Sequence, residues 1–124
     1  KPIRKKLRPK HNGDIFMESI SHSRFARFSY RKVGQVLKLI KGKTVIDAMG
    51  VLPWAPRVSR VLVGKTLKSA VANAGKGVDV TRLKVSKAWV NHGPALKRVM
   101  PKAMGSRAMF KRKTCHLTIV VSDN

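Results

Sequence analysis

The chain has 124 residues, of which 28 are Lys or Arg and 5 are Asp or Glu, which gives a formal net charge of +23. This length and an apolar content of 43% fit one domain with a hydrophobic core, and no apolar run approaches the ~20 residues that span a bilayer. A charge this large opposes compaction unless a polyanion neutralises it, so the composition predicts a nucleic-acid partner and argues against a membrane-surface protein, whose cations would gather on one amphipathic helix.

The N-terminal segment Lys1–Asn12, KPIRKKLRPKHN, is dense in Lys and Arg. Like charges at this density oppose collapse, and Pro2 and Pro9 disfavour a helix. We expect an extended basic arm that becomes ordered only on its partner; the alternative is a solvated tail.

A short strand and a helix are expected next. Ile20–Phe28 (ISHSRFARF) fits a strand, although its alternation of apolar and polar residues is imperfect. Ser29 can cap the N-terminus of the following helix, and Gly42 can cap its C-terminus. The apolar stripe of this helix has the spacing i, i+3, i+4, i+7 and consists of Val33, Val36, Leu37 and Ile40.

Two further helices follow. Thr44 can cap a short second helix, with Asp47 favouring its positive N-terminus and Pro53 closing it. Pro56 is expected in the first turn of a third helix, which ends at Gly75. Small residues near the end of this helix allow close approach of either a neighbouring helix or an RNA backbone. Its apolar stripe consists of Val63, Leu67, Ala70, Val71 and Ala74.

From Val80 onward the pattern changes to β-structure. Thr81–Asn91 is expected to be a strand with Leu83 and Val85 facing inward. A second strand alternates cleanly near the C-terminus and should be buried on one face. Its inward residues are expected to be Cys115, Leu117, Ile119 and Val121, and its outward residues His116, Thr118, Val120 and Ser122.

Between these two strands lies PALKRVMPKAMGSRAMFKRK, Pro94–Lys113, which carries seven cations and no carboxylate. Pro101 and Gly105 mark a turn near its middle. The simplest construction is a long antiparallel hairpin over residues 81–122 whose far half projects beyond the domain. An isolated ribbon is marginal in water, so this one is expected to need its partner for order.

Residues that could carry catalysis or bind metal are sparse. The four histidines lack metal-ligand spacing, and the single cysteine, Cys115, excludes an internal disulfide and a thiolate cluster. Two Gly-Lys-Thr triplets resemble the end of a P-loop but lack the glycine that the motif needs five positions earlier. We therefore expect no metal, no cofactor, no small-molecule substrate and no enzymatic activity.

Three segments carry a family resemblance. They are SRFARFSYRKVGQVLKLIKGK (Ser23–Lys43), LKSAVANA (Leu67–Ala74) and GPALKRVMPKAMGSRAMFKRKTCHLTIVVSD (Gly93–Asp123). Each is similar, in the same order, to a motif of the bacterial-type L22 family of large-subunit ribosomal proteins. The pattern of the last motif is Gly-Pro, a basic pair, Met or Arg before Pro, Arg-Ala-x-Gly-Arg-Ala and Lys-Arg-x-x-His-Ile-Thr-Val.

The resemblance implies an α+β fold with three helices packed on a small antiparallel sheet and a long projecting β-hairpin. It implies a structural role in the large ribosomal subunit, in which the protein binds large-subunit rRNA and helps to assemble it beside neighbouring ribosomal proteins. The hairpin tip would line the nascent-peptide exit tunnel and contact the nascent peptide transiently.

The candidate rRNA contacts are cations and hydrogen-bonding groups of the arm, the helices and the hairpin. They are Arg4, Lys5, Lys6, Arg8, Ser29, Arg31, Lys32, Lys43, Asn73, Lys97, Arg98, Lys102, Arg107, Lys111, Arg112, Lys113 and His116. The tip residues expected to line the tunnel are Met100, Pro101, Lys102, Ala103, Met104, Gly105, Ser106 and Arg107.

Met17 lies near the usual start of the family. Residues 1–16 are therefore expected to be a basic N-terminal extension, and residues 17–124 a single ribosomal-protein domain. At the tip, Met104 and Gly105-Ser106-Arg107 depart from the family pattern. The extension and the first residue, Lys1, favour an imported mitochondrial or plastid protein over a bacterial one.

The rival hypothesis is a DNA-compacting architectural protein. In such a protein the ribbon would enter the minor groove and Pro101 would act as a wedge. It would bind duplex DNA at least as well as structured RNA.

Overall fold

The structure, a computed structural model, describes residues 5–9 and 15–123. Its strands are β1 (Lys5–Pro9), β2 (Ile15–Ala26), β3 (Leu83–His92), β4 (Leu96–Pro101), β5 (Arg107–Arg112) and β6 (Cys115–Asp123). Its helices are α1 (Tyr30–Ile40), α2 (Val45–Val51) and α3 (Arg60–Ala74), with short 3-10 turns η1 (Leu52–Trp54), η2 (Val80–Arg82) and η3 (Ala103–Gly105).

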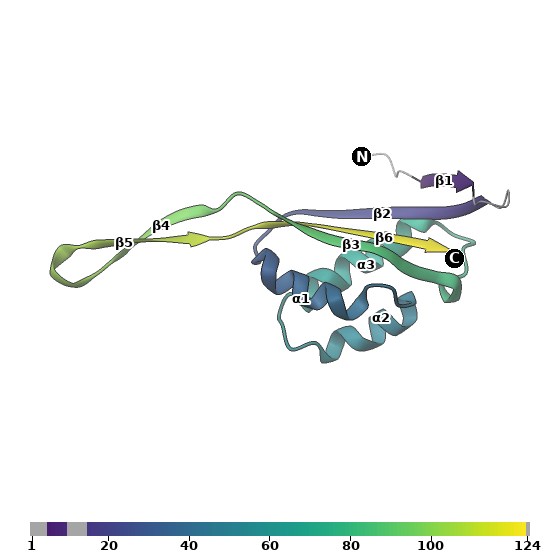
Figure 1. Ribbon diagram of the computed structural model, residues 1–124, viewed down its shortest axis with the longest axis horizontal. Helices are drawn as coiled ribbons and strands as arrows, with labels where there is room; N and C mark the ends of the chain where they lie inside the picture. Colours follow the sequence, from purple (N-terminus) through teal and green to yellow (C-terminus); the bar gives the residue numbers. More distant parts are fainter. Residues whose placement is uncertain (1–4, 10–14, 124) are drawn as a thin grey trace.

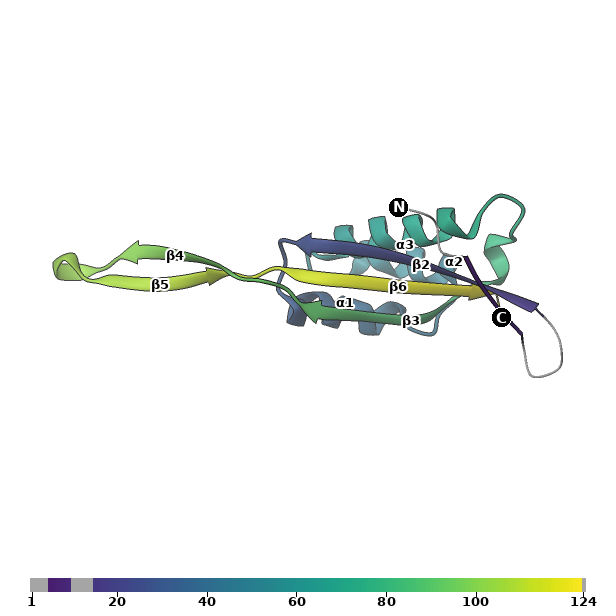
Figure 2. The ribbon, with the colours of Figure 1, turned by 90° about the horizontal axis from the view of Figure 1, so that it is seen from above.

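Four strands form an antiparallel sheet in the order β1-β2-β6-β3. All three α-helices lie on one face of this sheet, as Figure 1 shows from the side and Figure 2 from above. The strands β4 and β5 form a separate ribbon that continues the β3–β6 hairpin away from the domain (Figure 1). The predicted α+β fold with three helices, a small antiparallel sheet and a long projecting hairpin is confirmed.

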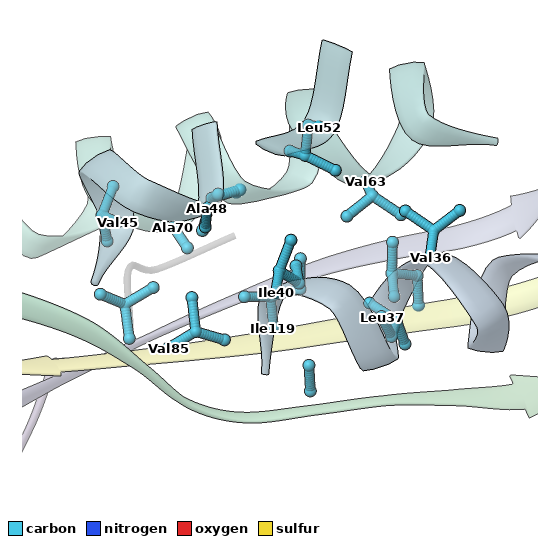
Figure 3. Packing of buried hydrophobic residues seen from close by; sticks show 14 of the residues in the cluster. Val36, Leu37, Ile40, Val45, Ala48, Leu52, Val63, Ala70, Val85 and Ile119 are labelled. Atoms are coloured by element: carbon cyan, nitrogen blue, oxygen red, sulfur yellow. The ribbon is translucent and has the colours of Figure 1, made fainter. Parts of the chain in front are cut away.

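A hydrophobic core between the helices and the sheet explains why these segments fold. The predicted stripe of α1 is buried, and so are the inward residues of the last strand. Burial of such side chains supplies the main driving force for folding. Figure 3 shows the packing of α1 residues Val36, Leu37 and Ile40 with Val85 and Ile119 of the sheet and with Ala48, Leu52 and Val63 of α2, η1 and α3.

Local signals set most helix ends. Thr44 caps α2 as predicted, because its Oγ1 accepts a hydrogen bond from the Asp47 N–H at 3.2 Å and donates one to the Asp47 carboxylate at 2.8 Å. Ser29 occupies the N-cap of α1, but its side chain makes no capping hydrogen bond. The C-cap of α1 is Lys41, one residue before the predicted Gly42, which follows it with a φ of +80°.

The start of α3 differs from the prediction. The helix begins at Arg60 with Ser59 as its N-cap, so the placement of Pro56 in its first turn is wrong. Ala55 is extended (ψ 134°), as residues before proline prefer, and it is buried. Its carbonyl accepts a hydrogen bond from Arg60 Nη1 at 2.8 Å, so the intervening residues form a connection and not a helical turn.

The small residues of α3 lie against the strand β2. The Ser19 hydroxyl donates to the Ala70 carbonyl at 2.8 Å, and Asn73 Nδ2 donates to the Ile20 carbonyl at 3.0 Å. The close neighbour on this side is therefore a strand, which was neither of the two alternatives left open.

The strand β6 is more buried than predicted. Thr118, Val120 and Ser122 were expected to face outward, yet all three are buried; His116 is half-buried. The reason is that β6 lies between β2 and β3, whose side chains shield it on both edges. The prediction of a half-buried strand is wrong for this central position.

Part of the predicted N-terminal arm belongs to the sheet. Lys5–Pro9 is the strand β1, which pairs antiparallel with residues 15–19 of β2. Lys5–Pro9 therefore has a partner for its backbone hydrogen bonds within the chain. The ordering of the arm on an external partner stays a prediction. Arg4 lies outside the described residues.

Candidate nucleic-acid interface

The β4–β5 ribbon stands clear of the helices (Figure 1). Its register runs from Leu96 opposite Arg112 to Pro101 opposite Arg107, and every residue of β4 is exposed. No carboxylate occurs in Pro94–Lys113, the ribbon with its flanking residues, to neutralise the seven cations of that segment. An anionic surface would neutralise these cations, while exposed apolar side chains such as Val99 and Met109 fill the gaps between its groups.

The cross-strand pairs divide the cations between two faces of the ribbon. Lys97 lies directly opposite Lys111, an arrangement of like charges that destabilises a strand pair. On the other face Arg98 lies opposite Phe110, and the guanidinium carbon of Arg112 is 5.2 Å from the centre of the Phe110 ring. The second face therefore offers guanidinium groups beside an aromatic ring.

An open hollow of about 700 Å³ lies at the base of the ribbon, where it meets the end of β2 and the start of α1. No carboxylate is among the described residues that line it. Six predicted RNA contacts come together here: Ser29, Lys32, Arg98, Lys111, Arg112 and Lys113. The remaining lining residues are Arg27, Phe28, Leu96, Phe110 and Thr114.

A neck joins the sheet to the ribbon, made of residues 93–95 on one strand and residues 113–114 on the other. The Gly93 N–H donates to the Thr114 carbonyl at 3.0 Å, and the Thr114 hydroxyl donates to the Pro94 carbonyl. A Cβ atom on Gly93 would lie 2.6 Å from Thr114 Oγ1 and 3.0 Å from its carbonyl carbon. The strands can close at the neck because Gly93 has no side chain, and this closure sets the direction of the ribbon.

The tip of the ribbon is a tight turn, as Pro101 and Gly105 predicted. The Lys102 N–H donates to the Ser106 carbonyl at 2.8 Å, and the Ser106 hydroxyl donates to the Ala103 carbonyl at 2.8 Å. Met104 has a φ of +57° and a fully exposed side chain. The turn thus presents a flexible apolar side chain among cations at the far end of the molecule.

Lys97, Lys102 and Arg107 belong to the ribbon but do not line the hollow, and several other predicted contacts lie elsewhere in the domain. Arg31 Nε donates to the Tyr30 hydroxyl at 3.3 Å. The Lys43 carbonyl accepts a hydrogen bond from the Val85 N–H, which places Lys43 near the end of the sheet that is remote from the ribbon. Asn73 donates to β2, and His116 lies on the sheet face without helices. The backbones of Lys5, Lys6 and Arg8 lie in β1.

Sequence reasoning missed two features of this region. Arg27 lines the hollow, and the available signal was its place in the basic run just before α1. Phe25 has a φ of +55° at a β-bulge between Ser23 and Ala26. The imperfect alternation of this strand was the available signal for the bulge.

The described carboxylates gather at the end of the domain that is remote from the ribbon. Glu18 lies opposite Ser122, and Asp123 ends β6, where it accepts a hydrogen bond from the Met17 N–H at 2.8 Å. Asp79 precedes β3, and Asp47 starts α2 close to the same end. Within the described residues, one end of the molecule is therefore cationic and the other mixed in charge.

The one cysteine of the chain, Cys115, is buried in the core. Burial raises the pKa of the Cys115 thiol, and a backbone hydrogen bond with Phe28 partly offsets this rise, so the thiol stays neutral and unreactive in the core. No group of three His, Cys, Asp or Glu side chains within the described ranges could hold a metal ion. None of the helices described is long and apolar enough to cross a membrane.

Comparisons with known proteins give a consistent result. Residues 21–122 match the family described as ribosomal protein L22p/L17e. The large ribosomal subunit protein uL22 of Endomicrobium trichonymphae is 47% identical over 107 residues, which cover 86% of this chain and 93% of that relative. This relative is bacterial, so it gives no support to the organellar preference.

Proposed function

Because the chain belongs to the ribosomal protein L22p/L17e family, we propose that it is a structural component of the large ribosomal subunit that binds large-subunit rRNA and helps to assemble it. The observation that carries this proposal is the exposed β4–β5 ribbon, because Pro94–Lys113 contains seven cations and no carboxylate. Folded rRNA supplies both the negative charge and the irregular surface that such a ribbon needs.

The hollow at the ribbon base is the proposed anchor. Arg98 and Arg112 can each bind a phosphate with two parallel hydrogen bonds, and Lys32 adds a point charge from α1. Phe110 provides an apolar floor against which a ribose or base can pack. These groups come from separate elements, so the hollow would recognise a folded RNA backbone and not a linear sequence.

The ribbon tip has a different role in this proposal. Met100 to Arg107 would form part of the nascent-peptide tunnel wall, while Lys102 and Arg107 would also contact rRNA. Its mixture of exposed Met and Pro side chains with Lys102 and Arg107 would give a passing peptide weak and varied contacts. Residues 17–124 would form the ribosomal domain, and residues 1–16 a basic extension beside neighbouring ribosomal proteins.

The test is a competition between variant and wild-type chains for incorporation into large subunits. Reversing the charge at Lys97 and Arg98 to Glu should strongly reduce incorporation, because it places anions against rRNA phosphates. The matched control reverses Lys68 and Lys76, two exposed lysines on α3 and the turn after it. Equal incorporation of the ribbon variant and the wild type would contradict the proposal, and so would equal loss in both variants.

Duplex DNA separates this proposal from the rival architectural role. The wild-type chain should prefer a folded large-subunit rRNA fragment over duplex DNA in direct competition at one salt concentration. Preference for the duplex would favour the DNA-compacting alternative.

A further inference from the structure

The face of the four-stranded sheet that carries no helix presents aromatic and imidazole side chains close to the ribbon. Figure 2 looks onto this face, with the strands in front of the helices. Two neighbouring cross-strand rows are formed by residues of β2, β6 and β3. The first row contains Phe25, His116 and Asn91, and the second contains His22, Thr118 and Trp89.

Phe25 is held in a costly conformation at this face. Its φ is +55° although it is neither glycine nor asparagine, and 64% of its surface is exposed. The side chain therefore contributes little to the core in return for the backbone strain. Strained residues of this kind cluster at functional sites.

His116 fixes the position of the Phe25 ring. Its Nδ1 accepts a hydrogen bond from the Phe25 N–H at 3.1 Å, and the two rings meet edge to face with their centres 4.8 Å apart. Because Nδ1 accepts, the proton of the neutral ring is on Nε2, which is left as a donor. One face of Phe25 is thus exposed beside a defined hydrogen-bond donor.

The second row supplies another ring. Trp89 is 41% exposed and lies opposite Thr118, whose hydroxyl shares a hydrogen bond of 3.0 Å with His22 Nδ1. Phe25 and Trp89 lie on the two strands that flank β6, about 10 Å apart across the sheet and in rows ~7 Å apart along it, so each can receive a separate flat ligand.

The charge around this face selects the ligand. Four exposed cations border this face. Arg24 and Arg27 lie at the end of β2, and Lys84 and Lys87 lie on the edge strand β3. The described carboxylate on this face, Glu18, lies opposite Ser122 at the remote end. Aromatic faces beside cations suit the bases and phosphates of a single-stranded nucleic acid.

We propose that this sheet face is a second RNA-binding surface, on which unpaired nucleobases stack on Phe25 and Trp89 while the bordering cations hold their phosphates. The inference rests on the proposed function, because the rRNA of the large subunit would supply the unpaired nucleotides. It adds a site on the sheet face, next to the hollow with which it shares Arg27, that binds single strands by stacking.

The test measures the binding of a labelled, unstructured single-stranded RNA to the full chain by fluorescence anisotropy. Trp89→Ala and Phe25→Gly should each weaken binding by about 5- to 150-fold, the usual loss for one stacked base. Trp54→Ala is the matched control, because Trp54 is 87% exposed but lies on η1. It should leave the affinity unchanged, and Trp89→Phe should retain most of the binding.

Folding is controlled by the choice of variant. Glycine adopts positive φ without strain, so Phe25→Gly should keep a melting temperature at or above that of the wild type. Loss of affinity with retained stability would support stacking. Unchanged affinity in both Trp89→Ala and Phe25→Gly would overturn the inference, and so would an equal loss of affinity in Trp54→Ala. Tighter binding of an acidic peptide than of RNA would also overturn it.

A ribbon variant separates this inference from the proposed function. Lys97→Ala with Arg98→Ala should weaken binding to a folded large-subunit rRNA fragment. If it does so while Trp89→Ala and Phe25→Gly bind single-stranded RNA as tightly as the wild type, only the stacking inference fails. If the wild-type chain does not bind the rRNA fragment, the proposed function itself fails.

Discussion

At the residue scale, Gly93 shows how one missing side chain shapes the interface. The contacts at the neck leave no room for a Cβ atom, since the atoms it would meet belong to Thr114, including its backbone. Backbone atoms cannot rotate away as the end of a flexible side chain can. The direction of the ribbon therefore depends on this position.

Gly93→Ala should lower the free energy of unfolding by about 1–3 kcal/mol, the usual cost of forcing extra atoms into a packed site. Urea denaturation of the free chain would measure it. Gly50→Ala is the control, because no atom lies within 4 Å of its added Cβ in α2. This control should raise stability by up to about 1 kcal/mol, and a neck variant as stable as the wild type would show that the strands can open there.

Single residues also mark the limit of sequence reasoning. The cations of the hairpin were identified individually, but the hollow was not, because Lys32 and Arg98 meet only when α1 docks beside the ribbon base. The exposure of Phe25 depends on a β-bulge. A positive φ is predicted from sequence mainly at glycine or asparagine, and this position is neither. Trp89 reads equally well as a core residue until the register of β3 on β6 is known.

At the element scale, the periodicity of apolar residues predicted burial best for elements that pack against the core on one side only. The stripe of α1 and the inward face of β3 were predicted correctly because each packs on a single side. The burial of β6 was underestimated, since a sequence does not reveal that a strand will lie at the centre of a sheet. The start of α3 was misplaced because Pro56 fits an extended connection as well as a first turn.

The stability of the ribbon in the unbound protein can be changed by a single substitution. Lys111→Glu replaces a cross-strand pair of like charges by an ion pair with Lys97, which should stabilise the free ribbon by about 0.2–1 kcal/mol. Slower amide hydrogen exchange in β4 and β5 would report this gain. The same variant should bind rRNA more weakly, because it loses a cation.

Lys102→Glu provides the comparison for this prediction. It makes the same charge change at the turn, where no lysine lies directly opposite in the strand register. It should therefore weaken rRNA binding without slowing exchange in the strands. Equal exchange rates in both variants would show that the Lys97–Lys111 repulsion has no effect on the ribbon.

At the scale of the whole molecule, the excess of cations is the dominant property. Each phosphate neutralised on binding contributes about 0.7–0.9 to the slope of log affinity against log salt. A chain with a net charge of +23 should therefore show a steep slope on large-subunit rRNA.

Lys97→Ala with Arg98→Ala should make this slope shallower by about 1.4–1.8, which is two phosphate contacts at 0.7–0.9 each. Filter binding at a series of salt concentrations would measure the change. The control, Lys68→Ala with Lys76→Ala, should change the slope less. A wild-type slope near zero would contradict electrostatic binding altogether.

The separation of carboxylates from the cationic ribbon gives the molecule an electric dipole along its longest axis (Figure 1). In the field of a polyanion, such a body experiences a torque before it touches anything. It should approach the polyanion end-on, with the β4–β5 ribbon in front and the folded domain behind. Orientation would then be decided during diffusion, over distances of about one Debye length, rather than by trial and error on the surface.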